Sequence, residues 1–139
     1  MPTLSLEDIQ LMNLIEMTTG AKANDLVHED GTLVILVQKG DLGKAIGKGG
    51  ANAQKLRQKL GKEIAMVEDA DDPQAFVANA LAPAVLRSVD VSEEGGRKVA
   101  VVSVDAKNKG SAIGRGGEKI KRARLLMQRK FGFDDVKIR

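Results

Sequence analysis

The 139-residue sequence contains no cysteine, tryptophan or tyrosine, and it has only three phenylalanines and one histidine. Without cysteine the chain forms no disulfide and offers no thiolate to a metal ion. A single histidine, His28, cannot supply an imidazole cluster, so a zinc site is excluded. The shortage of aromatic rings also argues against surfaces that stack nucleotide bases on aromatic side chains.

Long apolar runs are missing as well. No stretch is long enough to cross a bilayer, and residues 1–4 lack the basic start and apolar centre of a signal peptide. We therefore expect a cytoplasmic protein that does not engage membranes. Hydrophobic residues at 42% and charged residues at 29% are normal for a globular chain, and the length suits one ordinary domain or two very small ones.

Positive charge is concentrated in two windows, 39–62 and 107–130. The first window holds seven Lys or Arg against one acid, and the second holds nine against one. Together they carry 16 of the 22 basic and 2 of the 19 acidic residues, a net of +14, whereas the rest of the chain carries 6 against 17, a net of −11. Such segregation, behind a net charge of only +3, is typical of a protein with a polyanion-binding face.

A glycine-rich segment lies inside each basic window. Residues 45–50 read Ala-Ile-Gly-Lys-Gly-Gly, and residues 112–117 read Ala-Ile-Gly-Arg-Gly-Gly. The same offset of 67 places Val37 on Val104, so the preceding strand, the loop and the following helix repeat without a gap. Glycine lets the backbone approach a ligand closely, and a helix that follows at once presents free N–H groups. Each loop is therefore expected to bind an anion.

The pattern predicts one order of elements in both halves. A first helix begins at Ser5, where Asp8 completes a capping box, and it ends at Gly20. Its apolar residues are expected in the core: Leu6, Ile9, Met12, Leu14, Ile15 and Met17. The lone His28, beside a turn, is expected to be a solvated surface residue.

The other elements of the first half are expected as strands 23–28 and 32–37, a short turn 40–45, a helix up to Gly61 and a strand 63–67. In the second half we expect a helix after Asp72-Pro73, strands 85–91 and 97–104, an entry turn 108–112, a long helix with Ile120, Ala123, Met127 and Phe131 on its apolar face, and a strand 136–138. Asp69, Asp71 and Asp72 are explained by a linker and a helix cap, so no metal or other cofactor is expected. The segment 76–83 is expected to pack between the two domains.

Three kinds of phosphate-binding loop fit the glycines to different degrees. In a nucleotide-hydrolysing P-loop, Gly43 would precede Gly47-Lys48 by one more residue, and a hydroxyl would stand at Gly49. A dinucleotide-binding loop would need glycine where the chain has Asn52 and Lys119. The GXXG loop of a KH domain, which clamps about four nucleotides by their backbone, fits both copies.

The order of elements also selects the KH subtype. Each loop follows a helix and two strands and precedes a helix and one strand, which is the type II arrangement. The predicted fold class is α+β, with two tandem type II KH domains of order α-β-β-α-α-β, each a three-stranded sheet covered on one face by helices. The expected domains are residues 1–69 and 70–139.

The chain resembles the NusA family of transcription termination and antitermination factors. The resemblance rests on the tandem type II arrangement, on residues 43–52 and on Asp72-Pro73 with residues 76–84, and it covers essentially the whole chain. The polymerase-binding and S1 domains of the bacterial members have no counterpart here, so the likeness is to the short archaeal form. It implies binding of single-stranded RNA through Lys44, Ile46, Gly47, Lys48, Gly49, Gly50, Asn52, Ile113, Gly114, Arg115, Gly116, Gly117 and Lys119.

The family resemblance further implies RNA polymerase or other transcription factors as partners, and we expect a monomer. No nucleophile with a nearby base and no paired carboxylates stand out, so we expect no enzymatic activity. A KH-fold protein-interaction adaptor in the transcription or ribosomal machinery is the alternative, and a nucleotide hydrolase is a distant third.

Overall fold

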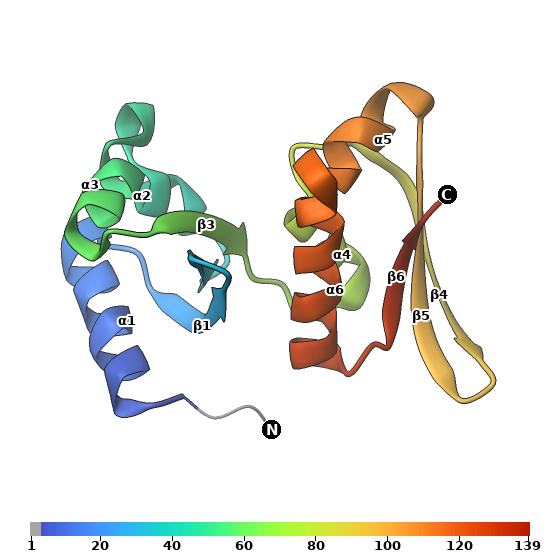
Figure 1. Ribbon diagram of the computed structural model, residues 1–139, viewed down its shortest axis with the longest axis horizontal. Coiled ribbons are helices and arrows are strands. Elements are labelled where there is room, and N and C mark those ends of the chain that lie inside the picture. Colours follow the sequence, from blue (N-terminus) through green and yellow to red (C-terminus); the bar gives the residue numbers. More distant parts are fainter. Residues whose placement is uncertain (1–3) are drawn as a thin grey trace. The chain divides into compact units, whose positions relative to one another are not determined.

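A computed structural model describes residues 4–139 (Figure 1). The chain divides into two compact units, one ending at Ala70 and the other beginning at Asp71. Both units have the element order α-β-β-α-α-β, with one turn of 3-10 helix at each glycine loop, so the predicted order is confirmed.

The first unit consists of α1 (Leu6–Thr19), β1 (Ala23–Glu29), β2 (Thr32–Val37), α2 (Leu42–Ile46), a 3-10 turn (Lys48–Gly50), α3 (Ala51–Leu60) and β3 (Glu63–Glu68). The second unit consists of α4 (Pro73–Leu81), β4 (Leu86–Glu94), β5 (Arg97–Val104), α5 (Ala106–Ile113), a 3-10 turn (Arg115–Gly117), α6 (Glu118–Phe131) and β6 (Asp135–Ile138).

Each unit is built on one three-stranded sheet. The second strand is central in both sheets, antiparallel to the strand before it and parallel to the last strand. In the second unit, α4, α5 and α6 lie on one side of the sheet (Figure 1). The short helix before each glycine loop follows the central strand after a connection of one to four residues, so the sheet fixes where the loop begins.

The core of the first unit lies between its sheet and its helices. Leu33, Ile35 and Val37 of β2 pack with Ile15 of α1 and Leu56 of α3. The continuous apolar run of β2 predicted a buried strand, and all five residues from Leu33 to Val37 are buried. Leu56, fully buried at the middle of α3, ties the helix that follows the first loop to this core.

The core of the second unit contains the aromatic residues. Phe76 of α4 is fully buried, and its ring meets the edge of Phe131 at the end of α6, with ring centroids 5.3 Å apart. Phe131 in turn lies edge-on to the buried Phe133. As expected, the helix after Asp72-Pro73 is the first helix of the second unit, and that it also packs between the two domains stays a prediction. Its apolar face packs on α6 because Phe76 and Phe131 come together there.

The prediction for α1 was wrong for part of its apolar set. Ile15 and Thr19 are the buried residues of this helix, whereas Leu6, Ile9 and Met17 are 71%, 47% and 84% exposed. Apolar residues occur on every side of α1, but the sheet and the neighbouring helices cover only one side. The sequence pattern therefore predicted a wider buried face of α1 than the structure has.

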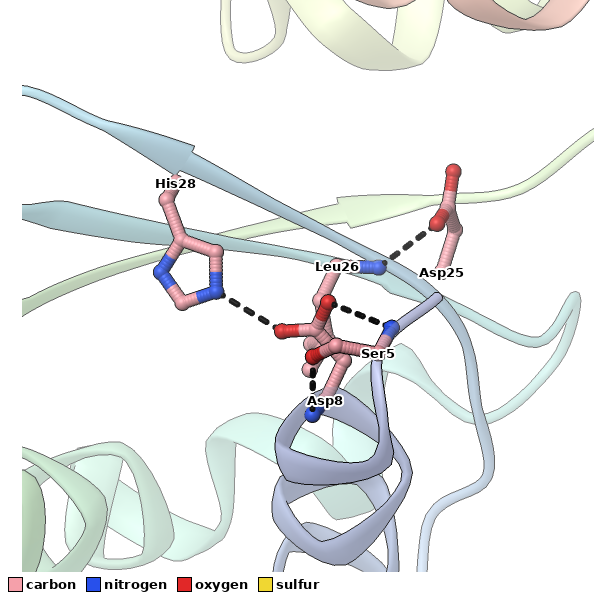
Figure 2. A network of polar contacts seen from close by, with 5 residues as sticks. All are labelled: Ser5, Asp8, Asp25, Leu26 and His28. Carbon is pink, nitrogen blue, oxygen red and sulfur yellow. Dashed lines mark hydrogen bonds and ion pairs between the residues drawn. The ribbon is translucent and has the colours of Figure 1, made fainter. Parts of the chain in front are cut away.

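The start of α1 is held by a small polar network (Figure 2). The Ser5 hydroxyl accepts the backbone N–H of Asp8 at 3.1 Å, and the Ser5 N–H donates to the Asp8 carboxylate at 3.2 Å, so the predicted capping box is confirmed. The other carboxylate oxygen of Asp8 lies 2.8 Å from Nε2 of His28 on β1. His28 is thus not a purely solvated side chain, because it ties the first helical turn to the sheet.

Replacing Asp8 with asparagine is expected to lower the free energy of unfolding at pH 7 by about 1 kcal/mol, as for the loss of other capping interactions. The pKa of Asp8 is lowered first by the hydrogen bond with His28 and then by the Ser5 N–H. A carboxyl group with a lowered folded-state pKa stabilises the fold above its unfolded pKa, and this contribution is lost as pH falls through the folded value. Urea unfolding of the wild type and Asp8→Asn should therefore differ at pH 7 and converge at strongly acidic pH. Glu7→Gln, outside the box, is the control, and a pH-independent difference for Asp8→Asn would contradict this account.

Candidate nucleic-acid interface

The two glycine loops have the same backbone conformation. Gly47 has φ/ψ of 78°/167° and Gly114 has 80°/171°, while Gly49 and Gly116 both have 62°/20°. In each loop, the N–H of the fourth residue donates to the carbonyl of the first, at 3.0 Å in the first copy and 3.1 Å in the second. The sequence repeat is therefore a repeat of three-dimensional structure.

The first glycine of each loop is required for two reasons. Its backbone lies in a region of positive φ and extended ψ that is essentially restricted to glycine. A Cβ atom on Gly47 would also lie 2.8 Å from the backbone nitrogen of Asn52, and one on Gly114 would lie 2.8 Å from Cβ of Lys119. The first glycine thus packs directly against the helix that follows.

The third residue of each loop faces open space. A Cβ added to Gly49 or Gly116 would meet no atom within 4 Å. The helices that follow, α3 and α6, begin after Gly50 and Gly117, and neither N-terminus is capped by a side chain. The first N–H group of each helix donates to a carbonyl of the loop. The positive end of the helix dipole beside an open glycine backbone is still a favourable place for an anion.

A cation and an apolar side chain flank each opening. Lys48 and Arg115 are exposed at the loop tips, and their side chains make no hydrogen bond or ion pair with the residues from 4 to 139. Ile46 and Ile113, just before the loops, are 39% and 40% exposed. A positive group next to an exposed apolar surface suits a ligand that combines phosphate with flat, partly apolar bases. Lys44 is also exposed, and its Nζ lies 3.9 Å from a carboxylate oxygen of Asp41.

Asn52 and Lys119, the fifth residues after the first glycines, have partners inside the protein. Nδ2 of Asn52 donates to the carbonyl of Lys44 at 2.7 Å, and Nζ of Lys119 donates to the carbonyl of Ala82 at 2.8 Å. Burial lowers the pKa of Lys119, and the nearby Arg122 lowers it further. That these two residues bind RNA stays a prediction.

Several basic residues of the two windows have structural partners that the sequence could not reveal. Nε of Arg124 on α6 lies 2.9 Å from the Asp135 carboxylate and donates to the carbonyl of Val136 at 3.0 Å, which ties α6 to β6. Nζ of Lys59 lies 3.4 Å from the Thr18 hydroxyl of α1. Part of the charge concentration thus serves the fold, and the loop-tip cations are the better candidates for ligand binding.

Neither a metal centre nor a membrane span is found in the part of the chain that the structure covers. Across residues 4–139, no three His, Asp or Glu side chains are grouped so that they could hold a metal ion. Over the same residues, every helix is too short or too polar to cross a bilayer.

Comparison with protein families gives two matches. A family model for KH domains matches residues 12–94, and a model described as the NusA-like second KH domain matches residues 73–138. Together with the two matching sheets, these results confirm the predicted fold of two KH domains.

Individual relatives match over nearly the full length. The chain is 41% identical over 136 residues to a protein of Halococcus morrhuae named "Probable transcription termination protein NusA", covering 98% of this chain and 97% of the relative. A protein of the same name from Methanococcus vannielii is 36% identical over 135 residues, which are 97% of this chain and 78% of the relative. The crystal structure of APE1850 superposes with a TM-score of 0.89 at 36% identity, over 98% of this chain and all of that one. The chain therefore belongs to the NusA family of transcription termination proteins, in its short archaeal form.

Proposed function

We propose that this chain is a non-enzymatic RNA-binding transcription factor that acts in termination or antitermination. Each GXXG loop clamps the sugar–phosphate backbone of single-stranded RNA, such as the nascent transcript. The relatives named as termination proteins and the two KH matches support the general role. The geometry of the loops supports the clamp.

The observation that carries the proposal is the pair of equivalent loops. Both combine, in neighbouring residues, an open glycine backbone, a helix N-terminus without a side-chain cap and an exposed cation. The cation differs between the copies, Lys48 in one and Arg115 in the other, whereas the glycine conformation is the same. A phosphate clamp needs positive charge and a close backbone but no particular basic side chain, which fits this pattern.

Two clamps of about four nucleotides each would cover on the order of eight nucleotides. Linking two weak clamps in one chain raises the overall affinity well above that of one clamp. The affinity should also fall as salt rises, because each neutralised phosphate releases counterions. These properties suit a factor that binds RNA of varying sequence.

The proposal is tested by placing acids in the loops. In the double variants Lys48→Asp/Gly49→Asp and Arg115→Asp/Gly116→Asp, carboxylates would face the phosphates, so each is expected to weaken binding about tenfold or more. A protein that carries both double variants should not bind RNA measurably. Fluorescence anisotropy with a labelled single-stranded RNA of about 12 nucleotides, slightly longer than two clamps, measures the effect.

A matched control carries the same substitutions at other turns. Lys22→Asp with Gly31→Asp and Arg97→Asp with Gly95→Asp make the same charge change, and both glycines have positive φ with no atom within 4 Å of an added Cβ. The control should bind RNA far more tightly than the loop variants. A folded protein with both loops changed that binds RNA like the wild type would refute the clamp. RNA would then be bound at another surface of the protein.

A further inference from the structure

Lys119 occupies an unusual place for a cation. It is the second residue of α6, in the first helical turn, where the helix macrodipole favours negative charge. Its Nζ atom reaches the carbonyl of Ala82, which directly follows the last residue of α4. Ala82 has an extended ψ of 143°, so its carbonyl is not one of the aligned carbonyls of α4. As a hydrogen-bond acceptor it still gives the ammonium group a partner inside the protein.

The stem of Lys119 also supports the loop. Its Cβ lies 2.8 Å from the position of a Cβ on Gly114, and its backbone nitrogen lies 2.9 Å from the same point. Lys119 is only partly exposed, whereas Arg115 at the loop tip is exposed. One side chain therefore connects the first glycine of the second loop to the end of α4.

Asn52 is the equivalent of Lys119 in the first domain, and it shows whether the glycine contact, the hydrogen bond and the charge occur in both copies. Asn52 also packs against the first glycine of its loop and also donates a side-chain N–H to a backbone carbonyl, that of Lys44. Asn52 carries no charge, however. At the loop tip, by contrast, the positive charge is present in both copies, as Lys48 and Arg115. The contact with the loop is thus common to Asn52 and Lys119, and the charge is not.

We propose that Lys119 is a positioning residue, which holds the second loop in its binding conformation and does not contact RNA phosphate. This inference rests on the proposed function, since it concerns the same clamp. It removes Lys119 from the predicted RNA-contacting set and accounts for a lysine in one copy and an uncharged asparagine in the other at this position of the repeat.

The ammonium group of Lys119 has three protons, and Ala82 accepts one of them. A phosphate contact by another proton is therefore the competing explanation, and salt dependence separates the two. For single-stranded nucleic acid, the slope of log affinity against log salt changes by about 0.7 for each phosphate that is neutralised. A positioning residue alters the affinity without altering this slope.

Three variants make the test, with the same RNA of about 12 nucleotides as the probe. Lys119→Met keeps a stem against Gly114 but removes the donor, and it should weaken binding about threefold to tenfold with an unchanged slope. Lys119→Asn copies the first domain, with the carbonyl of Ser111 in the place of Lys44, and it should bind more tightly than Lys119→Met, also with an unchanged slope. Arg115→Met is the reference and should reduce the slope by about 0.7.

The loop of the RNA-free protein supplies a second readout. In Lys119→Met, the amide chemical shifts of Gly114 and Gly117 should move before RNA is added, and in Arg115→Met they should stay close to those of the wild type. Thermal unfolding verifies that each variant is folded at the assay temperature.

A slope reduced by about 0.7 in Lys119→Asn or Lys119→Met would overturn the inference, because it would show a phosphate contact. Unchanged affinity in Lys119→Met would overturn it too, because the donor would then have no role. If Arg115→Met leaves both affinity and slope unchanged, the proposed clamp itself fails, and the inference fails with it. That result is recognisable because it does not involve Lys119.

Discussion

Replacing Gly47 or Gly114 with alanine is expected to lower the free energy of unfolding of the domain concerned by about 2–5 kcal/mol. Alanine would have to adopt a backbone conformation essentially restricted to glycine, at φ near 80° with extended ψ. Its Cβ would also lie 2.8–2.9 Å from side-chain and backbone atoms of Asn52 or Lys119, so the loop and the start of the following helix would have to move apart. Urea unfolding followed by circular dichroism measures the loss.

Gly49→Ala and Gly116→Ala are the matched controls. These glycines are also left-handed, at 62°/20°, but an added Cβ would meet no atom within 4 Å. The expected cost is about 1–2 kcal/mol, which is the price of the left-handed conformation alone. Equal losses at the first and third glycines would show that packing against Asn52 and Lys119 does not matter.

Replacing Phe76 with alanine is expected to lower the free energy of unfolding of the second domain by about 3–5 kcal/mol. The ring is fully buried and meets the edge of Phe131, so truncation would remove both apolar burial and an aromatic contact between α4 and α6. A loss of this size is a large share of the stability of a small domain. Urea unfolding, with amide hydrogen exchange to locate the change, is the measurement.

Phe76→Leu is the control for this prediction, because it keeps most of the apolar volume and should cost less than about 1.5 kcal/mol. Protection should be lost among amides of α4 and α6 in Phe76→Ala. A Phe76→Ala protein as stable as the wild type would contradict the assignment of this residue to the core.

Both loops and their flanking elements were predictable because their signals are local. Glycine at Gly47 and Gly50, the apolar run of β2 and the caps at Ser5 and Asp72 act within a few residues of sequence. The offset of 67 then related the strand, loop and helix of the second half to those of the first. Repetition thus did more than any single motif to identify the fold.

The side-chain partners could not be predicted, because they come from distant parts of the chain. Nζ of Lys119 meets a carbonyl 37 residues away, and His28 meets Asp8 across 20 residues. The sequence placed Lys119 in a basic window next to a phosphate loop, and charge alone then suggested RNA. Only the fold shows that the ammonium group points to α4.

The apolar pattern of α1 failed for a different reason. A helix pattern shows which residues share a face, but not how much of the helix its neighbours cover. Ile15 and Met17 are two residues apart and equally apolar in the sequence, yet one is buried and the other is 84% exposed. Coverage is a property of the tertiary structure.

The central claim is that both glycine loops hold RNA, and an NMR titration with single-stranded RNA tests it most directly. Isotope-labelled protein would be titrated with the RNA of about 12 nucleotides while the backbone amides are followed. We predict that the largest shifts occur at residues 47–52 and 114–119 and that both sets move together at low salt. If the amides of either loop do not shift and the largest changes occur elsewhere in the chain, the paired clamp is contradicted.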